Sequence, residues 1–234
     1  MSPQPLPPIV VALPGTGSDA HFAARAFTAA LSQVGADVLA VEPDPRRVVG
    51  SYVDALDEAA ARHRRIAVAG ISLGASVALR WATSHPDRAA GVLAALPAWT
   101  GDPIDAPAAR SAAYTASRLR ADGLDAVTVD MIDSSPAWLG DELARSWRSQ
   151  WPHLPLALEE AAGYHGLTEE QMARCPVPVG ICAAVDDAVH PLSVATLWSR
   201  VLPHAALETV TLDEVGADPA VLGRACLRAL QQVR

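Results

Sequence analysis

The sequence predicts an α/β protein with a mostly parallel sheet of about six strands and helices on both of its faces. Short apolar runs alternate along the chain with longer segments of helical periodicity. The apolar runs are continuous, which is typical of parallel strands buried on both sides. From about residue 100 to 174 the alternation stops. We therefore expect a single domain over residues 1–234, with a helical cap inserted at 100–174.

The elements follow one another in the order that such a sheet requires. Strands are expected at short apolar runs bounded by glycine, proline or polar residues: 9–13, 38–41, 66–69, 91–96, 177–184 and 206–212. Helices are expected where apolar residues recur every three or four positions: 19–34, 48–62, 73–84, 192–201 and 219–232. The inserted block falls between the fourth and fifth strands, so it can cover the carboxyl edge of the sheet.

Composition excludes several classes of function. The formal net charge of −8 argues against nucleic acid or an anionic membrane as partner. All 18 positive residues are arginines, which excludes every lysine-dependent mechanism. The three cysteines have no CxxC spacing, and we expect them to be reduced and buried. We expect that residues 1–5 do not begin a signal peptide, because no basic segment is followed there by an apolar run, and no apolar stretch is long enough to span a bilayer. We expect a cytoplasmic protein without a metal or other cofactor.

One motif carries a specific chemistry. Gly70-Ile71-Ser72-Leu73-Gly74 matches G-x-S-x-G and stands between a predicted strand and a predicted helix. In that context the serine takes a strained backbone conformation, and the flanking glycines prevent collisions around it. The turn lifts the hydroxyl above the carboxyl edge of the sheet. We predict Ser72 as a nucleophile; the alternative is a tight turn with an incidental serine.

From about residue 8 to the C-terminus, the order of these pieces resembles the α/β-hydrolase family of serine hydrolases. In that family the loop after the first of these strands supplies half of the oxyanion hole, and here it reads Leu13-Pro14-Gly15-Thr16. The resemblance implies that the backbone N–H groups of Thr16 and Leu73 hold the oxyanion. It also implies that the catalytic acid lies in the segment 184–191, where the best alignment places it at Asp187.

The chain departs from the family at the catalytic histidine. That histidine usually follows the final strand, but the loop that we expect at 214–219 contains none, so the chain resembles a divergent member that lacks the usual C-terminal histidine. Position removes three of the seven histidines, which are expected at the opposite edge of the sheet: His63, His85 and His204. His190 stands on the same loop as Asp187, at the correct edge, and we predict it as the general base. The alternatives are His21, one of the inserted histidines His153 and His165, or no base at all; Asp102 and Asp218 are reserve acids.

A second fingerprint competes with this interpretation. The run from Gly15 to Ala20 fits G-x-G-x-x-G/A after a strand, and Glu42 ends the next strand, as in a dinucleotide-binding oxidoreductase. The nearest comparison, the short-chain dehydrogenases, needs a Tyr-x-x-x-Lys pair that a chain without lysine cannot supply. The dinucleotide hypothesis also explains only one loop.

Tryptophans indicate the nature of the substrate. Four of the six lie in or at the start of the block after the fourth strand: Trp99, Trp138, Trp147 and Trp151. Leu143, Trp147 and Trp151 are expected to share one helix face, either as packing or as an apolar roof over Ser72. Trp99 follows a strand at its carboxyl end and is predicted to bind substrate.

The sequence therefore predicts a serine hydrolase that cleaves a carboxylic ester or thioester with a hydrophobic moiety. A small-molecule acyl ester would be the partner, the acyl-enzyme would form on Ser72, and acyl transfer to an alcohol stays open. A binding protein of the same fold that has lost its base is the alternative from another class.

Overall fold

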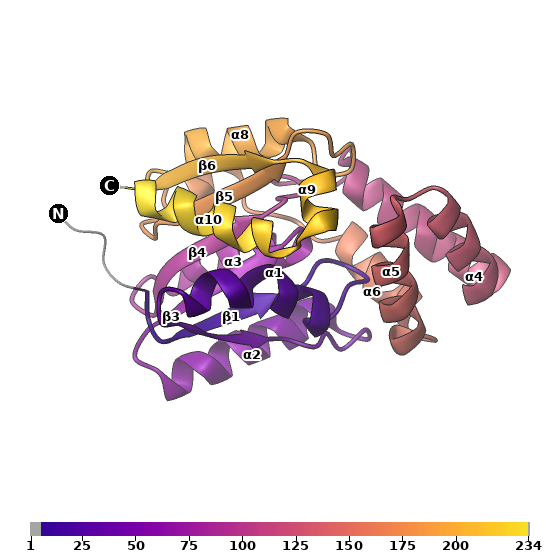
Figure 1. Ribbon diagram of the computed structural model, residues 1–234, viewed down its shortest axis with the longest axis horizontal. Coiled ribbons are helices and arrows are strands. Elements are labelled where there is room, and N and C mark those ends of the chain that lie inside the picture. The colour runs from indigo at the N-terminus through magenta and orange to yellow at the C-terminus, as the bar shows by residue number, and fades with distance from the viewer. Residues whose placement is uncertain (1–5, 234) are drawn as a thin grey trace.

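Six parallel strands form one sheet in the order β2-β1-β3-β4-β5-β6 in the computed structural model, which describes residues 6–233 (Figure 1). The strands are β1 Ile9–Leu13, β2 Asp37–Ala40, β3 Ile66–Ile71, β4 Ala89–Ala95, β5 Val179–Ala184 and β6 Ala205–Val210. The predicted parallel sheet of about six strands is confirmed. Residues 1–5, on which the expectation about a signal peptide depends, lie outside the described range.

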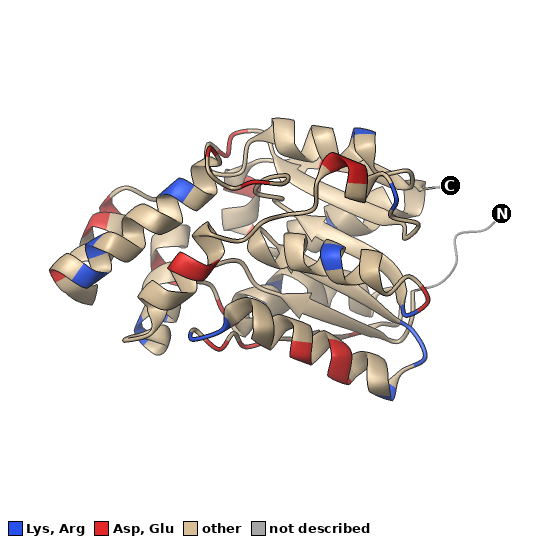
Figure 2. Ribbon diagram, turned by 180° about the vertical axis from the view of Figure 1, so that it is seen from behind, with Lys and Arg blue, Asp and Glu red and all other residues tan. Residues whose placement is uncertain are grey.

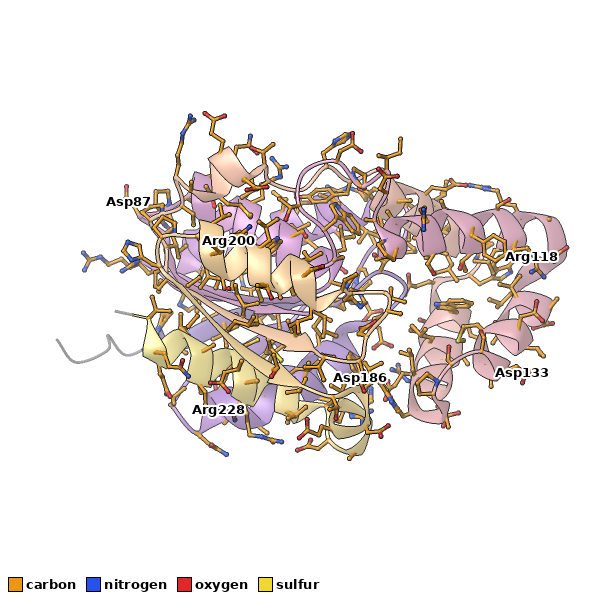
Figure 3. The ribbon with its side chains drawn as sticks, turned by 90° about the horizontal axis from the view of Figure 1, so that it is seen from above. Asp87, Arg118, Asp133, Asp186, Arg200 and Arg228 are labelled. Atoms are coloured by element: carbon orange, nitrogen blue, oxygen red, sulfur yellow. The ribbon has the colours of Figure 1, made fainter. Side chains whose placement is uncertain are left out.

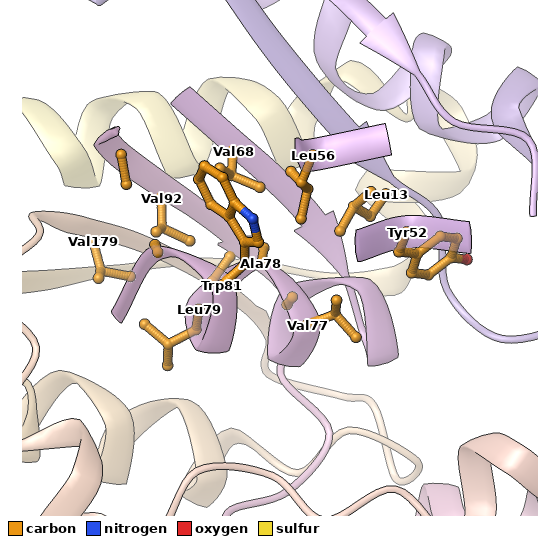
Figure 4. Close-up of a cluster of buried hydrophobic side chains, with 14 of the residues drawn as sticks. Leu13, Tyr52, Leu56, Val68, Val77, Ala78, Leu79, Trp81, Val92 and Val179 are labelled. Carbon is orange, nitrogen blue, oxygen red and sulfur yellow. The ribbon is translucent and has the colours of Figure 1, made fainter. Parts of the chain in front are cut away.

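Helices cover both faces of the sheet because alternate strand residues point to opposite sides. On one face, Val10 and Ala12 pack with α1 (Ala20–Ser32) and α10 (Ala220–Gln232). On the other, Val11 and Leu13 pack with α2 (Val48–Arg62), α3 (Leu73–Ser84) and α8 (Leu192–Val201). Figure 4 shows part of this second cluster, in which Trp81, Leu56 and Tyr52 approach the strand residues. The two clusters hold the sheet rigid beneath its carboxyl edge.

The insertion between β4 and β5 is helical, as predicted. It contains α4 (Pro107–Asp133), α5 (Ala137–Gln150), α6 (Leu154–Ala162) and the short α7 (Glu169–Met172), and α4–α6 project from one end of the molecule in Figure 1. The φ of +80° at Gly123 interrupts α4 and divides it into two helical parts. Buried residues of α4, α5 and α6 form a small core of their own, which includes Leu119, Trp147 and Leu154. These helices form the cap.

Two local expectations were wrong. Trp151 does not extend the stripe of Leu143 and Trp147, because α5 ends at Gln150 and Trp151 is extended and 39% exposed. Pro152 explains this end, since a residue before proline avoids the helical conformation. The segment after β6, expected as a loop, contains a short helix α9 (Leu212–Ala217). Thr211 and Glu214 begin that helix with a reciprocal capping box.

Charged residues lie mainly on helices and connecting loops around the sheet (Figure 2). Between residues 6 and 233, no helix has both the length and the apolar character needed to cross a bilayer.

Candidate active site

Ser72 stands on a sharp turn between β3 and α3. Its φ of 53° and ψ of −116° lie in a region that costs a side-chain-bearing residue free energy. The turn is held by a hydrogen bond from the Ser72 N–H to the Ala95 carbonyl, at 3.0 Å. A Cβ at Gly70 would lie 2.3 Å from the backbone of Gly74, and one at Gly74 would lie 2.4 Å from the Leu13 carbonyl oxygen. Both glycines are therefore required by close backbone approach.

A chain of hydrogen bonds runs from Ser72 through His190 to Asp187. The His190 Nε2 atom lies 2.9 Å from Ser72 Oγ, and His190 Nδ1 lies 2.8 Å from Asp187 Oδ2. Because a carboxylate only accepts hydrogen bonds, Nδ1 carries the proton and Nε2 is left to accept from the serine hydroxyl. The structure thus brings together the three residues that the sequence singled out, in an arrangement suited to removing the hydroxyl proton.

The loop after β5 lets Asp187 bind the imidazole of His190, although the two residues are only three positions apart. Asp187 Oδ1 accepts the backbone N–H groups of Val189 at 2.8 Å and His190 at 3.1 Å. That folds the loop back on the carboxylate and leaves Oδ2 for the imidazole. Burial by itself raises the pKa of Asp187, but hydrogen bonds and charge from His190, with the two backbone donors, outweigh it and hold the pKa below its ordinary value. Asp187 is therefore charged at neutral pH.

The two predicted oxyanion donors flank the serine. Leu73 is the first residue of α3, so its N–H has no acceptor within the helix. Thr16 belongs to a turn in which the Ser18 N–H donates to the Gly15 carbonyl at 3.1 Å, and Gly17 takes a φ of +71°. This turn runs directly beside the nucleophile, since a Cβ at Gly15 would lie 3.4 Å from Ser72 Cβ.

A cavity of about 840 Å³ opens above Ser72, between the carboxyl edge of the sheet and the cap. This volume lies within the range of small-molecule sites. Its lining includes the apolar side chains Phe22, Ile71, Leu96, Trp99, Leu143, Trp147 and Leu158. In Figure 3, Asp186 marks the side of the sheet that faces the cap, and Arg118 and Asp133 mark the cap itself.

Trp99 lines this cavity and is also buried against the segment that carries Tyr164. It is 5% exposed, and its indole N–H donates to the Tyr164 carbonyl at 3.0 Å. Leu96, which sequence reasoning missed, lines the cavity with a left-handed φ of 49° directly after β4. Only its place at the carboxyl end of a strand could have indicated it.

None of the alternative bases and acids raised by the sequence lines the cavity above Ser72. Among the cavity-lining residues of the described chain, His190 is the only histidine. The His21 side chain is 59% exposed, and its Nδ1 atom lies 3.9 Å from Glu142 Oε2. His153 is the residue directly before α6. Asp218 accepts from Arg224 at 2.8 Å. Across residues 6–233, no three His, Cys, Asp or Glu side chains gather as a metal site.

The backbone N–H groups at the start of α1, which a dinucleotide would need, already donate to side chains of the protein. Asp19 is 4% exposed and caps α1 by accepting the Phe22 N–H at 3.0 Å. Glu42 accepts the Ala20 N–H at 3.0 Å. A pyrophosphate needs these helix N-terminal donors free, so the arrangement counts against nucleotide binding.

No family model matches the sequence, and no curated protein matches it. Solved structures do resemble it. A hydrolase from Oleispira antarctica is 13% identical with a TM-score of 0.75, covering 97% of this chain and 92% of that chain. A hydrolase from Pseudomonas aeruginosa PA01 is 23% identical with a TM-score of 0.69, covering 94% and 89%. An esterase from Exiguobacterium antarcticum is 14% identical with a TM-score of 0.70, covering 94% and 91%. Together with the sheet order and the helical insertion, these likenesses show that the chain has the α/β-hydrolase fold.

Proposed function

We propose that this protein is a serine hydrolase that cleaves carboxylic esters or thioesters with a hydrophobic part, through an acyl-enzyme on Ser72. The observation that carries the proposal is the hydrogen-bond chain from Ser72 through His190 to Asp187 at the base of an apolar cavity. The esterase and the two hydrolases that share the fold support it.

In the acylation step, Ser72 Oγ attacks the carbonyl carbon while its proton passes to His190 Nε2. The carbonyl electron pair moves onto oxygen, where the Thr16 and Leu73 N–H groups stabilise the negative charge. When the intermediate collapses, the bond to the leaving oxygen or sulfur breaks, and the His190 imidazolium donates its proton to that atom. Asp187, charged and held by its own loop, stabilises the imidazolium while it exists.

Deacylation repeats these steps with water as the nucleophile. His190 takes a proton from the water as its oxygen bonds to the acyl carbon, and then returns it to Ser72 Oγ as the acyl–enzyme bond breaks. Every step uses groups of this chain and water alone.

The proposal is tested with a fluorophosphonate probe, which bonds phosphorus to a reactive serine oxygen and releases fluoride. We expect the wild type to be labelled and Ser72→Ala to stay unlabelled. His190→Ala should lower ester turnover by several orders of magnitude, up to about 10⁶-fold, while the protein stays folded. His21→Ala is the matched control, because that side chain is exposed and outside the cavity lining.

Two results would overturn the proposal. One is a folded wild type that is neither labelled nor active on aryl esters, which would favour a binding protein of this fold. The other is a His190→Ala variant as active as His21→Ala.

A further inference from the structure

One helix of the cap lies directly on the turn that carries Thr16. Three side chains of α5 reach that turn across more than a hundred residues of sequence. Ser146 Oγ donates to the Gly17 carbonyl, Gln150 Nε2 donates to the Ser18 carbonyl at 2.9 Å, and Arg145 binds both carboxylate oxygens of Asp19. In Figure 1 the indigo segment between β1 and α1 reaches towards α5. Every residue from Gly17 to Asp19 is thus held by the cap.

The contacts to Gly17 and Ser18 come from buried side chains, where solvent does not substitute for them, whereas the Arg145 side chain is 45% exposed. Ser146 is 1% exposed, Gln150 3% and Asp19 4%. A buried polar group without a partner is costly, which keeps the helix and the turn in one register. The Ser146 hydroxyl also lies 3.2 Å from the Leu143 carbonyl in its own helix, a longer contact than the one to Gly17.

Trp147 adds a steric constraint on the same turn. A Cβ at Gly17 would lie 2.8 Å from Trp147 Nε1, so the indole rests against the glycine. At the other end of the turn, the buried Tyr52 hydroxyl donates to the Pro14 carbonyl at 2.9 Å. The turn is therefore fixed at its start by α2 and at its end by the cap.

We propose that Ser146 and Gln150 are positioning residues, which hold the Thr16 N–H where the oxyanion forms. The inference rests on the proposed function and extends it: α5 is a fixed part of the oxyanion hole and not a mobile lid. Neither side chain lines the cavity above Ser72. Their effect passes through the carbonyls of Gly17 and Ser18, which follow Thr16 directly in the turn.

The physical reason is that oxyanion stabilisation depends on a donor fixed before charge develops. Removing one such donor costs about 10²–10³-fold in kcat, and misplacing a reacting group by about 1 Å costs about 10²-fold. A turn that has lost one of its two buried cap contacts is loosened but not removed. We therefore expect an effect of about 10- to 100-fold on kcat.

The test compares Ser146→Ala and Gln150→Met with Ser149→Ala. Ser149 is the matched control, because it lies on the same helix and its hydroxyl donates to the Ser146 carbonyl at 2.8 Å, away from the turn. Each kcat for a p-nitrophenyl ester is expressed per Ser72 site titrated to completion with the fluorophosphonate. A trifluoromethyl ketone with the same acyl chain serves as the second probe, since its adduct with Ser72 carries the oxyanion.

We expect the two positioning variants to lose about 10- to 100-fold in kcat with KM within about twofold, and to bind the ketone more weakly by the same factor. Ser149→Ala should match the wild type in both. A merely structural role would lower the fraction of titratable sites but leave kcat per site and the affinity for the ketone unchanged. That outcome, in an active wild type, overturns the positioning role and leaves the hydrolase standing. A wild type that does not react overturns both, and if Ser146→Ala fails to fold, Gln150→Met decides.

Discussion

Gly74→Ala is a small substitution with a large expected effect. The new Cβ would lie 2.4 Å from the Leu13 carbonyl oxygen and 2.7 Å from that of Pro14, where ordinary contact begins at 3.4 Å. Both obstacles are backbone atoms, so no side chain can rotate away. Two movements could relieve the clash: a shift of α3, or a shift of the end of β1 together with the turn that carries Thr16. Either shift must be about 1 Å.

The structure allows the cost in stability to be separated from the cost in activity. Overpacking of a well-packed region costs about 1–3 kcal/mol. In a chain of this size that corresponds to a fall in Tm of about 2–12 °C, which leaves the protein folded at 25 °C. The same displacement moves Ser72 relative to the oxyanion donors, and a 1 Å misplacement costs about 10²-fold. We therefore expect kcat/KM to fall by about 100-fold or more.

Thermal unfolding and p-nitrophenyl ester kinetics measure the two effects on one preparation. Gly163→Ala is the control, because a Cβ there would have its nearest contact at 3.6 Å, with the Glu159 carbonyl, and the position lies in the cap. That variant should retain wild-type kcat/KM. A Gly74→Ala protein with the kcat/KM of Gly163→Ala would refute the reasoning, because the turn that carries Ser72 would then tolerate a side chain that the geometry forbids.

Three further predictions concern the cavity and its acid. Trp99→Ala should reduce turnover of long-chain esters far more than of acetate esters, and should cost about 3 kcal/mol or more in the free energy of unfolding; equal losses in folded protein would reduce Trp99 to a packing residue. Asp187 has a folded pKa below its ordinary 3.8, so its carboxylate stabilises the fold above that pH and the contribution is lost as pH falls through the folded pKa. Asp187→Asn should thus lower Tm at pH 6 relative to wild type, with a difference that shrinks below about pH 4; a constant difference would contradict the assigned cause. Arg118, the one arginine among the described residues that line the cavity, already pairs with Asp122 and Asp130. A p-nitrophenyl ester ending in a carboxylate should therefore have a kcat/KM about 3- to 10-fold below that of its methyl amide. Added salt should reduce this difference in kcat/KM between the two esters. A higher kcat/KM for the carboxylate would contradict the prediction.

Much of this protein is readable from short-range patterns. The four central strands of the sheet, β1, β3, β4 and β5, were predictable because continuous apolar runs of about six residues reflect burial on both faces. The nucleophile turn was predictable for a related reason: Gly70, Ser72 and Gly74 lie within five residues, and the strand before them and the helix after them are equally local. His190 was reached by elimination, from the edge of the sheet on which each loop must emerge, and its role as base stays a prediction.

What the sequence determined by itself was the order of strands and helices, the place of the insertion and the turn that carries Ser72, because each depends on neighbours within a few residues. Only the tertiary structure decided which groups meet across long separations. The contact between Ser146 and Gly17 spans 129 residues, and that between Gln150 and Ser18 spans 132. No periodicity marks such polar pairs, since a serine or glutamine that holds a distant carbonyl has the same local pattern as one that faces water. The partner is selected by how the cap packs against the sheet, which depends on the whole chain at once.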